Sequence, residues 1–326
     1  MTPAPGQTIL AAPVRAQRVG MRSADNDGAP TREELGLVGA GGVTTLKSGQ
    51  VSFLTGRVLV WFSCGAPSAV AAKMAVAKMA VEKYRGKQPV EVLYCDTLKY
   101  EHPDNPRFMA DVAAWLGVEI KLLRSERYAD IFDVFDRTGW LVGPHGAKCT
   151  EELKREVRKA YQWAEDTHVF GYRADEADRI KLFESENPGL FCDWLLPDSG
   201  MSQSDCYRML RDAGIALPAM YRMGYRNNNC IGCVKGQAGY WNKIRRDFPE
   251  SFARMALQER KMNAAINKRY EGKKRIRVFL DELPPDAGRY DEEPDIECGP
   301  QCVMPVKLEE AFDGKLCAGG GGAELP

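Results

Sequence analysis

Short apolar segments alternate with helical segments across the middle of this 326-residue chain, and this alternation limits the folds that it can adopt. The segment 58–62 (VLVWF) is a continuous apolar run between glycines, as is typical of a strand buried on both faces of a parallel sheet. The predicted strands are 58–62, 90–94, 118–123 and 169–172, and the predicted helices are 68–84, 105–116 and 150–165. Strands joined through helices predict an α/β fold, in which a parallel sheet carries helices on both faces.

The chain is long enough for one large domain or two modest ones. We expect four parts: a flexible N-terminal extension (1–50), a nucleotide-binding α/β core (51–200), a mostly helical, cysteine-containing C-terminal region (201–317) and a flexible tail (318–326). The extension and the tail are rich in Gly, Ala and Pro and have no sustained period. In the C-terminal region, Ser202 is predicted to cap one helix and Pro249 to begin another.

The charges balance globally, with 45 Lys and Arg against 45 Asp and Glu, so no overall field favours nucleic acid or membrane. Locally they separate. Residues 243–277 hold twelve basic and four acidic residues, whereas 281–297 hold eight acidic and one basic. Three interpretations stay open: the two runs pair with each other, they form two solvated surfaces, or the basic run binds a polyanion.

No window approaches the run of about 18 apolar residues that a membrane span needs. The N-terminus has no compact apolar stretch behind a basic start, so we expect no secretory signal and a cytoplasmic location. In that reducing compartment, the ten cysteines are candidates for catalysis or metal binding before disulfides.

Ligands of parallel sheets bind beyond the carboxyl ends of the strands, so the loops there are the candidate site. The loop 63–68 (SCGAPS) has small residues that let backbone N–H groups approach an anion, at the N-terminus of a predicted helix. Its Ser63, Gly65 and Ser68 resemble the pyrophosphate loop of the adenine nucleotide α-hydrolase-like superfamily. Cys64 and Pro67 stand where that pattern has Gly and Asp, which argues against ATP cleavage.

Two more strand ends resemble nucleotide-binding proteins. Asp96 and Thr97 follow the second strand, where the superfamily has an Asp-Thr close to the nucleotide. After the fourth strand, Gly171, Arg173 and Arg179 fit the G-x-R-x-x-E-x-x-R element of sulfonucleotide reductases. The glycine permits close backbone approach, and the two guanidinium groups suit phosphate or sulfate.

The cysteines resemble the pattern of the [4Fe–4S] adenylyl-sulfate reductases. Cys149, Lys154, Cys230 and Cys233 fall on that pattern, in which a Cys-Cys pair and a Leu-Lys precede a C-x-x-C. Thr150 replaces the second cysteine of the pair, so three thiolates remain for a cluster that needs four ligands.

Cys302 is the candidate fourth ligand, in the segment 297–302 (ECGPQC). In the same segment, Cys298 resembles the catalytic thiol near the C-terminus of these reductases. Two alternatives stay open: a structural zinc ion bound by Cys230, Cys233, Cys298 and Cys302, or thiols that are free or reversibly disulfide-bonded.

Together the motifs resemble the phosphoadenosine phosphosulfate (PAPS/adenylyl-sulfate) reductase family, in a form found in phage and bacterial proteins. The resemblance covers roughly residues 58–302. It implies an oxidoreductase that reduces an adenylyl sulfate to sulfite through a thiosulfonate on Cys298, aided by Lys154 and by a thioredoxin- or glutaredoxin-like reductant. One alternative is an ATP-dependent, iron–sulfur-assisted sulfur transferase that acts on tRNA or DNA. Another is a non-enzymatic nucleotide-binding remnant with a zinc site.

Overall fold

The structure, a computed structural model, describes residues 17–18, 37–38, 43–46, 51–53, 56–80, 89–143, 146–296 and 298–301. The predicted tail and most of the predicted N-terminal extension lie outside the described residues. The extension contributes the short strands β1 (Gln17–Arg18), β2 (Leu37–Val38) and β3 (Val43–Leu46), and β2 and β3 form an antiparallel sheet with β4 (Val51–Phe53).

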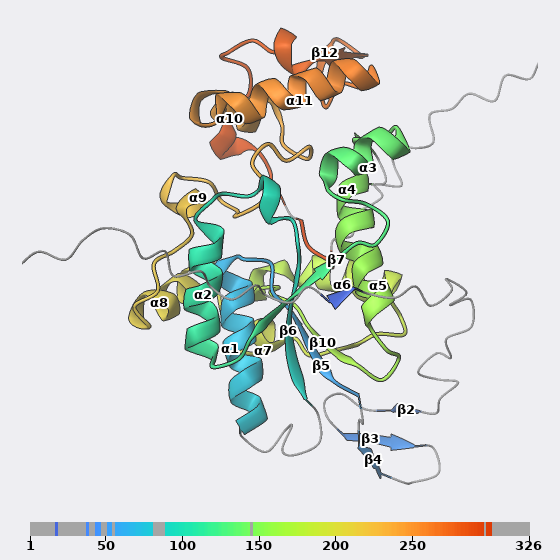
Figure 1. The fold of residues 1–326 in the computed structure, drawn as a ribbon, viewed down its shortest axis with the longest axis vertical. Helices are drawn as coiled ribbons and strands as arrows, with labels where there is room; N and C mark the ends of the chain where they lie inside the picture. Colours follow the sequence, from blue (N-terminus) through green and yellow to red (C-terminus); the bar gives the residue numbers. More distant parts are fainter. Residues whose placement is uncertain are drawn as a thin grey trace, which may run out of the picture.

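A parallel sheet forms the centre of the molecule, as the sequence predicts (Figure 1). Its order is β1-β7-β6-β5-β10-β11. The strands are β5 (Val58–Trp61), β6 (Val90–Cys95), β7 (Ile120–Arg124), β10 (Thr167–Val169) and β11 (Phe191–Cys192). Counted along the chain from β5, the order is third, second, first, fourth, fifth. The order therefore reverses between β5 and β10, and such a switch point is where α/β sheets bind ligands.

Helices cover both faces of the sheet. Successive residues of a strand point to opposite sides, and all four residues of β5 are buried, so both sides need a covering layer. Val58 and Val60 pack into one core with α1 (Ala66–Ala80), α2 (Asn105–Leu116) and α8 (Gln203–Asp212). Leu59 and Trp61 pack into another core with α5 (Glu156–Tyr161) and α6 (Ala177–Glu186). This arrangement confirms the predicted fold class, an α/β fold in which a parallel sheet carries helices on both faces.

The boundaries differ in places from those predicted. The predicted helix 150–165 is broken into α4 (Lys148–Thr150), a π-helical turn at Glu151–Arg155 and α5. The strand predicted at 169–172 is β10 at 167–169, and Gly171 lies just beyond its end. Helix α2 begins at Asn105, as predicted, and ends before Gly117, which adopts a left-handed conformation; its N-cap residue is Asp104. Sequence analysis missed β11, α3 (Ile131–Thr138) and the short pair β8 (Val142–Gly143) and β9 (Gly146–Ala147).

The C-terminal region is mostly helical, as expected. It contains α8, α9 (Ala219–Arg222), α10 (Ala238–Asp247) and α11 (Pro249–Met262), and α7 (Leu195–Asp198) directly precedes it. Ser202 caps α8 and Pro249 begins α11, as predicted. An unpredicted antiparallel hairpin follows, made of β12 (Asn267–Glu271) and β13 (Lys274–Val278). Helices α10 and α11 share a separate core with α3, above the parallel sheet in Figure 1. Among the described residues, no helix is both long enough and apolar enough to cross a membrane.

Candidate active site

The loop between β5 and α1 is held in shape by its own serines. The backbone N–H of Ser63 donates to Ser68 Oγ at 3.0 Å, and Ser68 Oγ donates to the Gly65 carbonyl at 2.9 Å. Cys64 between them has φ of 59°, in the left-handed region that favours glycine. The backbone therefore keeps the conformation that suits the glycine of the superfamily pattern, even though a cysteine occupies the position.

The end of β10 packs directly against this loop. A Cβ atom on Gly171 would lie 2.7 Å from the backbone nitrogen of Ser68 and 2.8 Å from its Cα. Only glycine fits such an approach without displacing the backbone. Gly171 is thus the residue that lets the loops after β5 and β10 meet at the switch point of the sheet.

Two arginines follow on the same side, and both contact one buried carboxylate. Glu176 forms ion pairs with Arg173 and with Arg179, and it also accepts a hydrogen bond from the Arg173 backbone N–H at 2.8 Å. The Arg179 guanidinium lies over the Tyr172 ring, 4.9 Å from its centroid. The carboxylate thus orients both cations at the rim of the loop.

These elements enclose one pocket. Of the residues predicted from sequence, it is lined by Ser63, Gly65, Ser68, Gly171, Arg173, Arg179 and Cys298. The structure does not bring Asp96 and Thr97 to it. Asp96 forms an ion pair with Arg124, and Thr97 donates a hydrogen bond of 2.6 Å to Glu101.

Sequence analysis did not single out several residues that line the pocket. They are Tyr172, Gln203, Tyr221, Asn227, Asn228, Asn229, Ile296, Gly299 and Gln301; Pro67 and Glu176, which belong to the two sequence motifs, line the pocket too. The three consecutive asparagines directly before the C-x-x-C were the available signal, because side-chain amides at a loop offer several hydrogen bonds.

Cys298 reaches the pocket from near the C-terminus, and its thiol is in contact with α4. A hydrogen bond of 3.4 Å joins Cys298 Sγ to Thr150 Oγ1, and Lys154 Nζ donates to the Cys298 carbonyl at 3.3 Å. Burial alone would raise the pKa of Cys298. The ammonium groups of Lys154 and Lys235 and the Thr150 hydroxyl outweigh burial, so the pKa falls below its ordinary value. The lowered pKa favours the thiolate, which is the nucleophilic form.

Lys154 is enclosed by groups that keep it charged. It is only 6% exposed. Burial would lower its pKa, but the Cys298 and Cys230 thiols and the Glu101 carboxylate raise it above the usual value. A buried ammonium ion therefore stands beside the thiol that the family resemblance predicts to be catalytic.

The pKa values of the other cysteines predicted as metal ligands shift in the opposite direction. Burial raises the pKa of Cys149 and of Cys233 to about 12, and it also raises that of Cys230. The charges of these thiols and of Cys298 act on one another, so the four share one enclosed region. In the described part of the chain, no three His, Cys, Asp or Glu side chains are arranged to hold a metal ion. The predicted fourth ligand, Cys302, lies outside the described residues.

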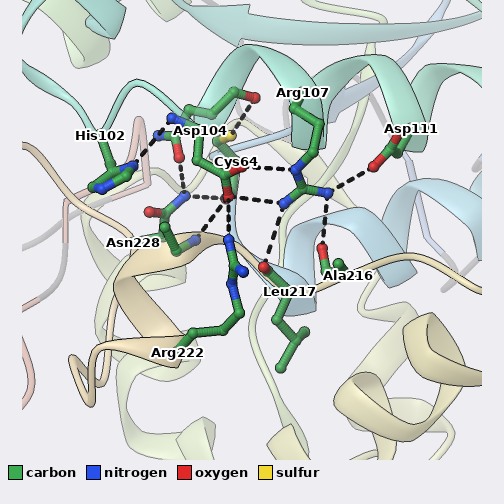
Figure 2. Close-up of polar contacts among 11 residues, drawn as sticks. Cys64, His102, Asp104, Arg107, Asp111, Ala216, Leu217, Arg222 and Asn228 are labelled. Atoms are coloured by element: carbon green, nitrogen blue, oxygen red, sulfur yellow. Dashed lines mark hydrogen bonds and ion pairs between the residues drawn. The ribbon is translucent and has the colours of Figure 1, made fainter.

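The asparagine segment is fastened to the core by the network drawn in Figure 2. Asn228 Nδ2 donates to the Cys64 carbonyl at 2.7 Å and to Asn105 Oδ1 at 2.9 Å. Asp104, at the start of α2, accepts hydrogen bonds from Arg107 and from the backbone N–H of Ala219. The cysteine-containing region is thereby held against the loop after β5.

Comparison with known proteins gives limited similarity. No protein-family model and no curated protein matches the sequence. One solved structure similar to this chain is phosphoadenylyl-sulfate (PAPS) reductase from Candida auris in a phosphate complex. The identity is 13%, the TM-score is 0.38, and the match covers 55% of this chain and 82% of that one.

Proposed function

We propose that this protein is a sulfonucleotide reductase-like enzyme of the PAPS/adenylyl-sulfate reductase family, in its phage and bacterial form. The observation that carries the proposal is the pocket itself. It places a thiol of lowered pKa, Cys298, in the same cavity as the small-residue loop and the two arginines. A thiolate opposite anion-binding groups suits nucleophilic attack on an anionic substrate.

The binding roles follow from the chemistry of the lining. The loop with Ser63, Gly65 and Ser68 lies at the N-terminus of α1, which favours the anionic end of an adenylyl sulfate. Arg173 and Arg179 hold its other oxyanions, and Glu176 keeps the two guanidinium groups oriented.

The reaction uses two steps. In the first, the Cys298 thiolate attacks the sulfonate sulfur. An S–S bond forms, the S–O bond to the nucleotide phosphate breaks, and the nucleotide leaves with that electron pair. In the second, one thiol of a dithiol reductant attacks Cys298 Sγ and releases sulfite, and its other thiol then resolves the mixed disulfide. The dithiol supplies two electrons, which reduce the sulfur from S(VI) to S(IV).

Lys154 serves the first step. As a buried ammonium ion beside Cys298, it stabilises the thiolate and offsets the negative charge of the substrate. The cycle needs a thioredoxin- or glutaredoxin-like dithiol and a reducing compartment such as the cytoplasm.

A [4Fe–4S] cluster on Cys149, Cys230, Cys233 and Cys302 remains part of the proposal, with structural zinc as its alternative. No step above depends on the cluster, whereas the zinc set contains Cys298 and would occupy the nucleophile. Iron, sulfide and zinc analysis of anaerobically purified protein separates the two: about four irons indicate the cluster, and one zinc indicates the structural site.

The activity is tested by sulfite release from adenylyl sulfate and from PAPS, with a thioredoxin-like reductant. We expect release from at least one substrate, and its loss in Cys298→Ser. Cys192→Ser is the matched control, because Cys192 lies at the end of β11 and does not line the pocket. If the wild-type protein releases no sulfite from either substrate under anaerobic conditions, the proposal is wrong.

A further inference from the structure

The hairpin β12–β13 presents a face of basic residues around one exposed tyrosine. Residues directly opposite each other in an antiparallel pair point to the same side of the sheet. Lys268 is opposite Arg277, and Tyr270 is opposite Arg275, so these four side chains share a face, which we call the hairpin face. All four are exposed, and Tyr270 is 62% exposed. The other side of the hairpin has the buried pair Asn267 and Val278.

The pairing on the hairpin face is unfavourable for the hairpin itself. Lys268 directly opposite Arg277 places like charges together, which destabilises a sheet. A two-stranded hairpin is also marginally stable on its own. Folding stability therefore does not explain these cations.

The acidic run that follows the hairpin does not neutralise it. Asp281 and Glu282 form ion pairs with Arg260, and Asp295 forms one with Arg226. The hairpin has six basic residues. Within the described residues, no carboxylate lies at ion-pair distance from five of them, Lys268, Lys273, Lys274, Arg275 and Arg277. Arg269 pairs with Glu271 on the opposite side of the hairpin. Of the three possibilities that the sequence left open, a polyanion-binding surface fits best.

We propose that the hairpin face binds single-stranded nucleic acid. The cations contact successive phosphates, and Tyr270 offers a flat ring on which an unpaired base stacks. Lys268 Nζ lies 5.8 Å from the centre of that ring, so the positive charge is positioned beside the stacked base. A duplex has no unstacked base to offer, which favours a single strand. Figure 1 shows the hairpin at the end of the molecule away from the parallel sheet, and this inference is independent of the proposed reductase activity.

The test is fluorescence anisotropy with labelled oligo(dT) and oligo(U) of about 20 nucleotides, with a duplex of the same length, over a series of salt concentrations. We expect both single strands to bind more tightly than the duplex. Affinity should fall with salt with a slope of about 0.7 per phosphate contact. Replacing Lys268, Arg275 and Arg277 by Ala should lower that slope by about 2, because three contacts are lost. The ratio of oligo(U) to oligo(dT) affinity distinguishes RNA from DNA as the source of the strand.

Tyr270→Ala should weaken binding about tenfold, whereas Tyr270→Phe should keep it, because stacking needs the ring and not the hydroxyl. The matched control replaces three exposed cations elsewhere, Lys181, Arg211 and Arg289, and should leave the salt slope unchanged. Thermal unfolding of each variant checks folding, and loss of Lys268 or Arg277 should not lower Tm. Equal slopes for the two triple variants, or binding to phosphatidylserine vesicles but to neither oligonucleotide, would overturn the proposal.

Discussion

Replacing Lys154 by Met should make Cys298 unreactive near neutral pH. Lys154 is the largest of the influences that lower the pKa of Cys298, and burial, which acts in the opposite direction, stays in place when it is removed. The neighbouring thiols show what burial does without enough compensating charge, since those of Cys149 and Cys233 have pKa values of about 12.

The size of the effect follows from those values. A cysteine has an ordinary pKa of 9.0 here, so a thiol that moves toward about 12 has roughly a thousandfold less thiolate at a given pH. Lys235 and Thr150 still lower the pKa of Cys298 in the variant, so we expect a loss of thiolate of up to this size. Alkylation rate follows the thiolate population and should fall accordingly.

The assay is alkylation by iodoacetamide between pH 6 and pH 10, with the peptide that contains Cys298 quantified by mass spectrometry. Lys159→Met is the matched control, because it removes an ammonium group that is half exposed and paired with Glu156 on α5. Thr150→Val should give a smaller rise in midpoint, because it removes only one hydrogen bond. An alkylation midpoint in Lys154→Met equal to that of the wild type would refute the role given to this lysine.

Three further changes test the fold around the site. Gly171→Ala should abolish nucleotide binding in calorimetry, because its Cβ would displace the backbone of Ser68, whereas Gly189→Ala, which has open space around it, should not. Asp104→Asn should lower Tm at pH 7 and flatten its acid dependence; hydrogen bonding holds the pKa of Asp104 at about 2, so its contribution is present above pH 3.8 and is lost below it. Burial lowers the pKa of His168 to about 3, so between pH 6.5 and pH 3 only the unfolded state takes up its proton. As the pH falls through that window, His168 should lower the free energy of unfolding by about 1.4 kcal/mol per pH unit. His168→Gln should lack this component in denaturant titrations.

Local signals explain why the sheet and the first loop were predictable. The continuous apolar run at β5 reads directly as a buried strand, and the small residues after β5 mark a loop that must turn tightly toward a helix. Gly171 was predictable as a close approach, although the atom it approaches, the Ser68 nitrogen, was not.

Long-range contacts explain most of what the sequence did not reveal. Cys298 meets Thr150 and Lys154 across more than 140 residues, and no local pattern encodes that meeting. Asp96 lies at a strand end as expected, but its side chain forms an ion pair with Arg124 and does not line the pocket. The position of a residue along a strand fixes which edge it is near, not which partner its side chain takes.

The hairpin was missed for a different reason. Six of the ten residues in its strands are charged, and β12 lacks the alternation that marks a half-buried strand. Only Asn267 and Val278 are buried, and the pairing rests on backbone hydrogen bonds that composition does not reveal.

The central claim is that Cys298 accepts the sulfonate group of an adenylyl sulfate. Its most direct test is mass spectrometry of the protein after incubation with PAPS or adenylyl sulfate in the absence of reductant. We predict an added mass of one sulfonate group on the peptide that contains Cys298, removed by a thioredoxin-like dithiol and absent in Cys298→Ser. Sulfite release by the wild type with no such adduct, or undiminished release by Cys298→Ser, would contradict it.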